Sequence, residues 1–285
     1  MKIASFQHAG VPLLGLVSAD GRQVRPLPSE CMREDGLLGL VSALASGAEL
    51  PQAGPPLQIE DVQLLAPFSR MRRNLWCVGR NYHEHAKELA GSVFRASQDK
   101  GWPIVFTKPP ECVVGPHADV MLPVGISDEI DYEAELAVVI GRGGRGITRA
   151  DAMKHVFGYT IVNDVTARDV QMRHQQWDLG KSFDGFCPMG PWVATADELD
   201  GRATRVRCWV NGELRQDART ENMIFDIPTL IETVSRGITL LPGDLIATGS
   251  PAGVGMGFKP PRYLASGDVV RIEIDGLGTL ENRFA

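Results

Sequence analysis

The amino-acid sequence predicts an α+β protein whose core is mainly β-sheet. From Leu75 onward, short apolar stretches alternate with glycine and proline, of which the chain has 31 and 19, and this punctuation is typical of many short strands. Helical spacing of apolar residues is confined to a few short segments. With 285 residues, 44% hydrophobic and 22% charged, the chain is long enough for one large domain and one small domain.

Residues 1–70 predict a small N-terminal α+β domain. Its expected elements are strands at 2–6, 13–18 and 23–26 and a helix at 37–46. The stretch 51–56 contains three prolines and a glycine and predicts a turn or linker. We place the boundary near residue 70, so that residues 71–285 form the larger domain. The expected helices of that domain are 83–91, 149–156, 166–176 and 228–235.

Overall composition argues against several classes of protein. The net charge of −6 disfavours a sequence-independent nucleic-acid binder, because that role needs a basic face. The chain has neither a run of about 18 apolar residues nor the apolar stretch of a signal peptide at its start, so no membrane partner is expected. Its five cysteines are scattered without a Cys-x-x-Cys pair, which favours reduced thiols and a cytoplasmic location.

The most informative local pattern is a pair of glutamates, Glu133 and Glu135, at the start of a predicted buried strand, 131–140. Alternate side chains of a strand share a face, so both glutamates project to the same side. Asp164, in a second apolar strand at 158–165, is expected to join them.

Most acid-x-acid pairs lie on solvated strand faces. Here the continuously apolar stretch 136–140 predicts burial on both faces and removes that solvation. Three buried carboxylates need a cation. Oxygen ligands favour Mg²⁺, Mn²⁺ or Ca²⁺ over zinc.

A predicted helix carries a candidate general base. His85 and Glu88 are three residues apart, so on a helix they share a face, and the carboxylate can orient and stabilise the imidazole. The alternative is an ordinary surface helix with many charges. The polar, glycine-bounded segment 92–101 could form a lid over the substrate.

The stretch Gly141-Arg-Gly-Gly-Arg-Gly146 matches the dinucleotide-binding pattern G-x-G-x-x-G. A dinucleotide site also needs a parallel crossover with a full helix, whereas the helical segment that follows is about two turns long. We therefore assign these glycines to a tight strand-to-helix turn and keep a nucleotide-dependent oxidoreductase as an alternative from another class.

Candidate donors for an anionic substrate are Lys108, Arg168, Gln171 and Lys181, although each cation taken singly is more often a surface residue than a ligand contact. The segment from Thr248 to Gly257 is rich in glycine but lacks the Gly-Lys-Ser/Thr ending of a P-loop. Its small residues suit close backbone approach to a small anionic ligand. No Gly-x-Ser-x-Gly or His-Glu-x-x-His motif is present, so a serine hydrolase or zinc peptidase finds no support.

From about Asn74 to Phe284 the chain resembles the fumarylacetoacetate hydrolase family. The motifs that carry the resemblance occur in one order along the chain. They are Gly-Arg-Asn-Tyr-x-x-His85, Phe-Thr-Lys108-Pro, Asp-Tyr-Glu133-Ala-Glu135-Leu, Asn-Asp164-Val-Thr-Ala-Arg168-Asp-Val-Gln171, Gly-Lys181-Ser-Phe and Ala-Thr248-Gly-Ser-Pro-Ala-Gly-Val-Gly.

This resemblance implies a β-roll or sandwich catalytic domain that forms homodimers. It also implies a divalent metal, Mg²⁺ or Mn²⁺ with Ca²⁺ as a further possibility, held by Glu133, Glu135 and Asp164, and a lid that carries His85 and Glu88. Members of the family cleave C–C bonds in β-diketo acids, decarboxylate oxaloacetate or isomerise related dienoates. The metal stabilises an enolate in each reaction.

The main functional prediction is hydrolysis of a C–C bond in a short 2,4-dioxo acid, which the stretch 259–264 also favours by resemblance. In this reaction His85 activates water with help from Glu88, Lys181 and Gln171 steady the developing charge, and the remaining expected substrate contacts are Lys108, Arg168 and Thr248. Oxaloacetate decarboxylation or dienoate isomerisation at the same site is the alternative. A silent ligand-binding member of the family is a third possibility.

Overall fold

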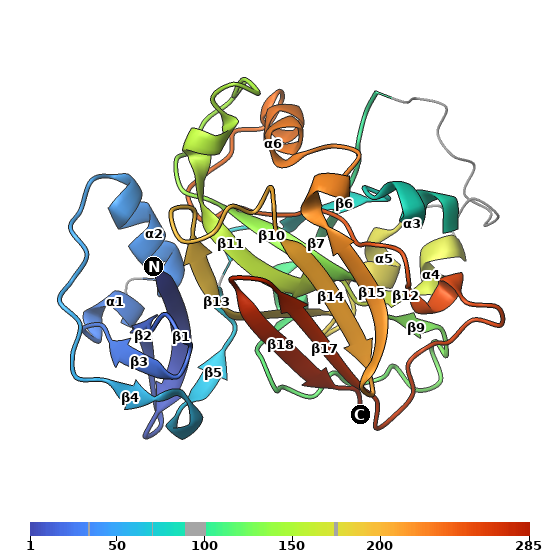
Figure 1. Cartoon of the computed structure of the whole chain (residues 1–285), viewed down its shortest axis with the longest axis horizontal. Helices are drawn as coiled ribbons and strands as arrows, with labels where there is room; N and C mark the ends of the chain where they lie inside the picture. The colour runs from blue at the N-terminus through green and yellow to red at the C-terminus, as the bar shows by residue number, and fades with distance from the viewer. Residues whose placement is uncertain (34, 70, 89–100, 174–175) are drawn as a thin grey trace.

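The protein is described by a computed structural model that covers residues 1–33, 35–69, 71–88, 101–173 and 176–285. The strands are β1 Lys2–His8, β2 Val11–Val17, β3 Gln23–Pro26, β4 Leu57–Gln58, β5 Gln63–Leu65, β6 Leu75–Gly79, β7 Ile104–Lys108, β8 Val113–Val114, β9 Ile130–Asp131, β10 Ala134–Ile140, β11 Val156–Asn163, β12 Thr166–Ala167, β13 Cys187–Thr195, β14 Arg205–Val210, β15 Glu213–Arg219, β16 Leu245–Ala247, β17 Val269–Ile274 and β18 Gly278–Arg283. The α-helices are α1 Glu30–Arg33, α2 Leu37–Ala45, α3 His83–Glu88, α4 Arg168–Arg173, α5 Asp178–Lys181 and α6 Ile227–Ser235, and 3₁₀ turns occur at Ile59–Asp61, Pro110–Cys112, Ala152–His155, Thr220–Asn222 and Gly255–Gly257. This is the α+β, strand-rich architecture that the sequence predicts (Figure 1).

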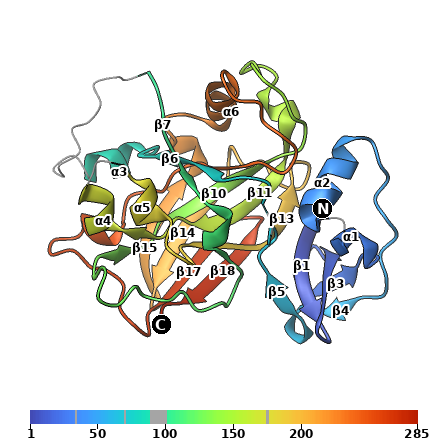
Figure 2. The same ribbon diagram turned by 180° about the vertical axis from the view of Figure 1, so that it is seen from behind.

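One long mixed sheet runs through the molecule in the order β4-β3-β2-β1-β13-β11-β10-β16-β6-β7. A second sheet of four antiparallel strands, β15-β14-β17-β18, lies across it (Figure 1). The helices α3, α4 and α5 gather at the end of the molecule opposite the N-terminal strands (Figures 1 and 2). The candidate site lies at that end.

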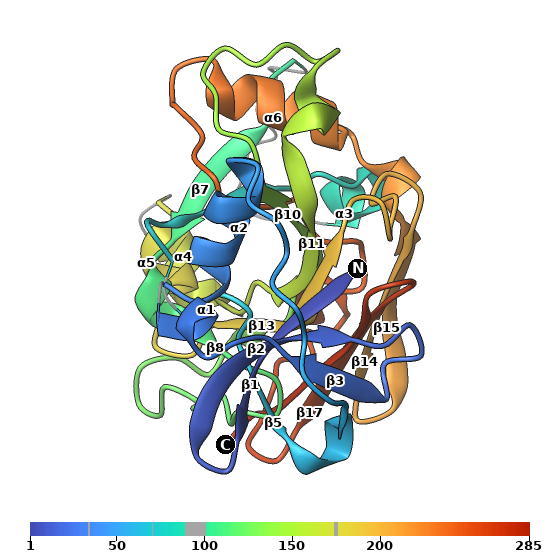
Figure 3. The same cartoon turned by 90° about the vertical axis from the view of Figure 1, so that its left-hand side faces the viewer.

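The N-terminal segment contains the three strands and the helix expected from the sequence. Its helix α2 lies over the N-terminal strands (Figure 3) and buries Leu37, Leu38, Leu40 and Val41. The segment extends the main sheet, because β1 pairs antiparallel with β13 and places Lys2 opposite Ala194. The predicted domain boundary, residue 70, falls between β5 and β6 but is itself outside the described ranges.

The strand β10 forms the centre of the protein, with every one of its residues buried between β11 and β16. Leu136, Val138 and Ile140 pack in a cluster with the four-stranded sheet, whereas Ala137 and Val139 pack in the cluster that includes α2. Full burial of such side chains contributes roughly 1.5–3 kcal/mol each. Two apolar faces therefore explain the continuously apolar sequence of this strand.

Several sequence-based expectations for local structure are wrong in detail. The helix expected at 149–156 is only a 3₁₀ turn at Ala152–His155, because the chain turns back there to place β11 antiparallel beside β10. The helix expected at 166–176 begins as the short strand β12 and becomes helical only from Arg168, and residues 174–175 lie outside the described chain. The expected helix at 228–235 is confirmed as α6.

The glycines between Gly141 and Gly146 lie in the connection from β10 to β11. These strands are antiparallel neighbours, so the parallel crossover that a dinucleotide site requires is absent at this loop. The expected tight turn is present, with Gly146 at a φ of 65°, but it leads into the 3₁₀ turn rather than into a helix.

Two further expectations concern cysteines and membranes. Cys77, Cys112, Cys187 and Cys208 are buried thiols without a disulfide, in agreement with a role in core packing, whereas Cys31 is only partly buried. In the part of the chain that is described, no helix has both the length and the apolar character needed to span a bilayer.

Candidate active site

Three acidic side chains meet at the end of the central strands, as the sequence predicts. Glu133, Glu135 and Asp164 are buried, and each offers a carboxylate oxygen within 4.8 Å of the others. The expectation that all three belong to strands is wrong for two of them, because Glu133 immediately precedes β10 and Asp164 immediately follows β11. The backbone N–H of Asp164 donates to the carbonyl of Glu133 at 2.9 Å and holds the two ends together.

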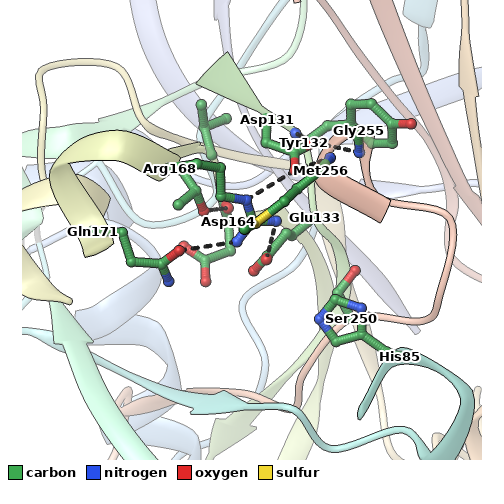
Figure 4. Close-up of polar contacts among 12 residues, drawn as sticks. His85, Asp131, Tyr132, Glu133, Asp164, Arg168, Gln171, Ser250, Gly255 and Met256 are labelled. Atoms are coloured by element: carbon green, nitrogen blue, oxygen red, sulfur yellow. Dashed lines mark hydrogen bonds and ion pairs between the residues drawn. The ribbon is translucent and has the colours of Figure 1, made fainter. Parts of the chain in front are cut away.

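Buried cations surround the triad. Lys181 Nζ lies 2.7 Å from Glu133 and 2.6 Å from Asp164, and Lys108 Nζ lies 2.8 Å from the other Asp164 oxygen. Arg168 extends to the carboxylates of Asp131 and Glu133, at 2.8 and 2.6 Å (Figure 4). These three cations are each at most 2% exposed. The three cations come from β7, α4 and α5. Together with the carboxylates they join four stretches of the chain, namely Lys108, 131–135, 164–168 and Lys181.

The charges on Glu133 and Glu135 are balanced differently. Burial by itself raises the pKa of Glu133, but the charges of Lys181, Arg168 and His85 outweigh burial and hold that pKa well below its usual range. Glu135 accepts a hydrogen bond of 2.8 Å from Gly249 N and forms no ion pair within the described residues. Burial, followed by the charges of Asp164 and Glu133, raises the pKa of Glu135 well above its usual range.

This imbalance fits a divalent cation. Within the described part of the cluster, four carboxylates (Asp131, Glu133, Glu135 and Asp164) face three paired cations (Lys108, Arg168 and Lys181). The Asp164 Oδ1 atom, although close to Lys108, also has no hydrogen bond of good geometry there. An excess of buried carboxylate oxygens suits a hard cation such as Mg²⁺ or Mn²⁺.

The helix α3 presents the candidate base. His85 Nδ1 lies 3.1 Å from Glu88 Oε2, and the side chains are 4% and 17% exposed. Gly253 N donates to both oxygens of Glu88, at 3.0 and 3.2 Å, and so fixes the carboxylate. The alternative of an ordinary surface helix applies only to its outer face, where Lys87 pairs with Glu84 in solvent. The segment proposed as a lid, 92–101, lies outside the described residues except for Gly101.

The glycine-rich segment that starts at Thr248 organises the site through its backbone. Its amides were expected to approach a small anionic ligand, but in the structure they donate to carboxylates of the protein itself. These hydrogen bonds are Gly249 to Glu135, Gly253 to Glu88, and Gly255 and Met256 to Asp131. A Cβ atom on Gly257 would lie 2.0 Å from Glu88 Oε1, so the close approach depends on glycine.

A pocket opens beside these groups. Its lining includes six of the residues expected from the sequence, namely His85, Glu133, Glu135, Arg168, Gln171 and Lys181. Lys108 and Thr248 were expected to contact substrate, but both side chains are fully buried. Lys108 Nζ is engaged by Asp164 and by the Val165 carbonyl, and the Thr248 hydroxyl donates to the Leu136 carbonyl. The structure gives these two residues supporting positions behind the pocket.

The pocket is also lined by residues that the sequence did not single out: Val78, Gly79, Arg80, Phe106 and Trp177, together with Ser250 and Met256 from the glycine-rich segment 248–257. Arg80 belongs to the motif that leads to His85, and this neighbourhood was the one signal for it. Trp177 packs edge-on against Phe106, with ring centroids 5.3 Å apart. A Cβ on Gly79 would lie only 2.2 Å from the Trp177 ring, so glycine admits the indole to the pocket wall.

The fold and this acidic site define a class of enzyme, and comparison with known proteins identifies it. Residues 74–285 match the family model described as fumarylacetoacetate (FAA) hydrolase, C-terminal. The chain belongs to the fumarylacetoacetate hydrolase family, as its motifs indicated. It is 43% identical over 289 residues to the oxaloacetate tautomerase YisK of Bacillus subtilis (strain 168), covering 99% of this chain and 93% of that protein.

Solved structures agree with this assignment. The fumarylacetoacetate hydrolase of the psychrophile Exiguobacterium antarcticum superposes with a TM-score of 0.87 at 42% identity, covering 100% of this chain and 99% of that chain. A maleylpyruvate hydrolase from Sphingobium sp. SYK-6, solved with manganese(II) and pyruvate, has a TM-score of 0.80 at 30% identity, covering 100% and 99%. The family therefore includes a member that holds a divalent metal together with a small oxo acid.

Proposed function

We propose that this protein is a divalent-metal-dependent enzyme that interconverts the keto and enol forms of oxaloacetate. The observation that carries the proposal is the presence, in one pocket, of two groups: Glu135, which has no cationic partner among the described residues, and His85, which is buried and paired with Glu88. Glu135, as a buried carboxylate without a cationic partner in the described chain, favours a bound metal ion, and His85 provides a general base. The similarity to an oxaloacetate tautomerase over nearly the whole chain supports this reaction and substrate.

Tautomerisation moves a proton between C3 and the 2-oxo oxygen. Glu133, Glu135 and Asp164 would hold Mg²⁺ or Mn²⁺, which when bound would stabilise the negative charge that develops on the 2-oxo oxygen. Because His85 directs Nδ1 to Glu88, its Nε2 can accept the C3 proton while Glu88 stabilises the imidazolium. Lys181 and Gln171 also line the pocket, and their side-chain N–H groups can donate hydrogen bonds to the oxygens of the substrate. The proton that leaves C3 is balanced by the proton that the oxygen gains.

The C–C hydrolase predicted from the sequence remains a second candidate, favoured by the similarity to the maleylpyruvate hydrolase. It uses the same residues but also requires a water molecule held between His85 and the distal carbonyl. Decarboxylation of oxaloacetate, which needs no attacking water, is the third outcome to be distinguished. We prefer tautomerisation because it needs neither an attacking water molecule nor the breaking of a C–C bond. It requires only a proton transfer at the enolate that the site would stabilise.

One panel of assays separates these reactions. The purified protein, loaded with Mn²⁺ or Mg²⁺ or treated with EDTA, is mixed with oxaloacetate and with acylpyruvates, and the enol signal, pyruvate and carboxylic acid products are followed separately. We expect keto–enol exchange of oxaloacetate to be the fastest reaction and to stop in EDTA. A larger kcat/KM for acylpyruvate cleavage would favour the hydrolase, and turnover that resists the chelator would contradict every metal-dependent candidate.

Homodimer formation and a cytoplasmic location stay predictions. A loop before β9 leaves Met121, Val124 and Ile126 more than 60% exposed, and an apolar group of this kind is a candidate contact with a second copy. Light scattering on the protein and on Val124→Glu tests this point. A dimer that persists in the variant would place the contact elsewhere, and a monomeric wild type would contradict the prediction.

A further inference from the structure

The four-stranded sheet reaches the pocket through one buried side chain, Gln216. This residue lies in β15 beside a bulge at Arg215, where the register with β14 shifts by one residue. Bulges are frequent next to active sites, where they redirect a neighbouring side chain. Gln216 is fully buried and is the one buried residue of its strand. A buried amide costs free energy unless it is hydrogen-bonded, so its partners indicate its role.

Both ends of the Gln216 amide are hydrogen-bonded, and the partners fix which way the amide is turned. The Oε1 atom accepts from Ala134 N at 3.0 Å. The Nε2 atom donates to the carbonyl of Pro251 and to Ser250 Oγ, both at 2.7 Å. A backbone N–H can only donate and a carbonyl can only accept, so the reversed orientation of the amide is excluded.

This orientation determines how Ser250 can act. Its Oγ atom receives one of the two Nε2 hydrogens of Gln216, so the proton of the hydroxyl must point elsewhere. Within the described residues that proton has no acceptor. Ser250 is 2% exposed and lines the same pocket as His85 (Figure 4). The pocket is therefore the direction in which the hydroxyl can donate.

A hydroxyl donor in this place suits the ligand class of the proposed function. A 2-oxo acid carries oxo and carboxylate oxygens, which accept hydrogen bonds, and hydrogen bonds to charged acceptors are the stronger kind. A serine without a fixed partner could turn either its proton or a lone pair to the ligand, and a lone pair repels an anion. Fixing the direction of the proton before the ligand binds removes the unfavourable arrangement.

We propose that Gln216 is a positioning residue that turns the hydroxyl proton of Ser250 into the pocket, so that Ser250 donates a hydrogen bond to an oxygen of the bound 2-oxo acid. The inference rests on the proposed function for its class of ligand. It gives β15 a part in ligand binding, although no residue of this strand is among the described residues that line the pocket.

The test is a double-mutant cycle between Gln216→Met and Ser250→Ala, measured by calorimetric titration of the Mn²⁺-loaded protein with pyruvate. We expect Ser250→Ala to weaken pyruvate binding by about 10- to 100-fold, as for a lost hydrogen bond to a charged group. Gln216→Met should weaken it by about 3- to 10-fold, as the cost of ordering one free side chain. In the Ser250→Ala background, Gln216→Met should have no further effect.

The affinity for Mn²⁺ separates this role from a structural one. Gln216 also holds the backbone between Glu133 and Glu135 through Ala134 N. If that contact were its main contribution, Gln216→Met would weaken Mn²⁺ binding together with pyruvate binding. We expect Mn²⁺ affinity to stay close to that of the wild type, and a parallel loss of both affinities would overturn the inference.

Asn282 provides a matched control. It is a buried amide that donates to two backbone carbonyls, those of Gly115 and Ala118, at 2.9 and 2.8 Å. Asn282→Leu should lower the melting temperature as Gln216→Met does but leave pyruvate binding unchanged. If Gln216→Met does not fold, Gln216→Glu replaces it in the cycle, because it keeps the size of the side chain and an acceptor for Ala134 N, yet draws the Ser250 proton to itself.

Three results would contradict the role of Gln216. They are an unchanged pyruvate affinity in the Gln216 variant, a loss of the same factor with and without the Ser250 hydroxyl, and a Mn²⁺-loaded wild type that binds no pyruvate. A wild type without keto–enol exchange of oxaloacetate would refute the proposed function instead, since the cycle is measured on binding and does not depend on turnover.

Discussion

The two sides of the candidate active site are built differently. On one side, Asp131, Asp164, Lys108 and Arg168 are at most 2% exposed, and each makes contacts to more than one partner. On the other side, α3 carries His85 and Glu88 next to an exposed face, and Glu88 retains 17% exposure. The first side combines charge balance with the packing of four chain segments, whereas the second contributes a single hydrogen-bonded pair.

This difference predicts which substitutions should lower the stability of the fold and which should lower only the rate of the reaction. Removing one partner of a buried ion pair leaves an uncompensated charge in the interior, which is strongly destabilising. Removing the base His85 leaves only Glu88 without its partner, and Glu88 is partly exposed to solvent. The acid side is therefore expected to control stability and metal affinity, and the α3 side to control proton transfer.

The largest effect on stability is expected for Arg168→Leu, because it leaves Asp131 and Glu133 without a major partner. We expect the free energy of unfolding to fall by about 3–5 kcal/mol, as for other broken buried pairs. The control is Arg219→Leu, in which the lost partner is Glu221 and both side chains are 54% exposed; it should lose at most about 1 kcal/mol. Urea unfolding measures the free energy of unfolding of both variants. Similar small losses in the two would show that the buried ion pairs of Arg168 do not determine the stability of the cluster.

On the α3 side, His85→Ala should lower the rate of keto–enol exchange by about 10²- to 10⁴-fold, since a positioned general base is removed. Stability and Mn²⁺ affinity should stay close to those of the wild type. His83→Ala changes an exposed histidine on the same helix and should leave turnover unchanged. If His85→Ala retains full activity, the assignment of the base is wrong.

The metal itself is tested by Glu135→Gln. Because burial and two neighbouring acids raise the pKa of Glu135, the neutral glutamine should leave the metal-free protein at least as stable as the wild type. Added Mn²⁺, at about 100 times its Kd, should stabilise the wild type by about 2.7 kcal/mol and the variant hardly at all. Melting curves in EDTA and in Mn²⁺ measure this, with Glu60→Gln, an exposed acid in the N-terminal segment, as control. Equal stabilisation of both proteins would remove Glu135 from the ligand set.

The smallest structural change is Gly257→Ala. The three atoms nearest to the new Cβ all belong to the flexible side chain of Glu88, so the carboxylate should move away from His85 while the backbone stays in place. We expect turnover to fall by about 10-fold, less than for His85→Ala because the imidazole remains. The free energy of unfolding should change by less than about 1 kcal/mol. Gly237→Ala, where a Cβ meets nothing within 4 Å, is the matched control, and an equal loss of activity there would contradict this explanation.

Much of the fold could be predicted from patterns along the chain. The continuously apolar β10, the three N-terminal strands and the amphipathic α6 follow from residue periodicity, which reports burial on one face or on both. The helix expected at 149–156 was wrong because a local pattern does not include the antiparallel return that the tertiary fold imposes. The break at residues 132–133, between β9 and β10, also depends on tertiary contacts and has no signal in the local pattern.

For the active site, the sequence by itself determined the residue types: three acids with an apolar strand behind them, and a histidine one helical turn from a glutamate. Only the tertiary structure decided the partners. Arg168 pairs with Asp131 across 37 positions, and Gly249 donates to Glu135 across 114. It also directed the loop amides to protein carboxylates, placed Lys108 and Thr248 behind the pocket and brought Arg80 to its edge. The physical reason is that periodicity records which face of an element is buried, whereas ion pairs and backbone hydrogen bonds form between elements whose approach no local pattern encodes.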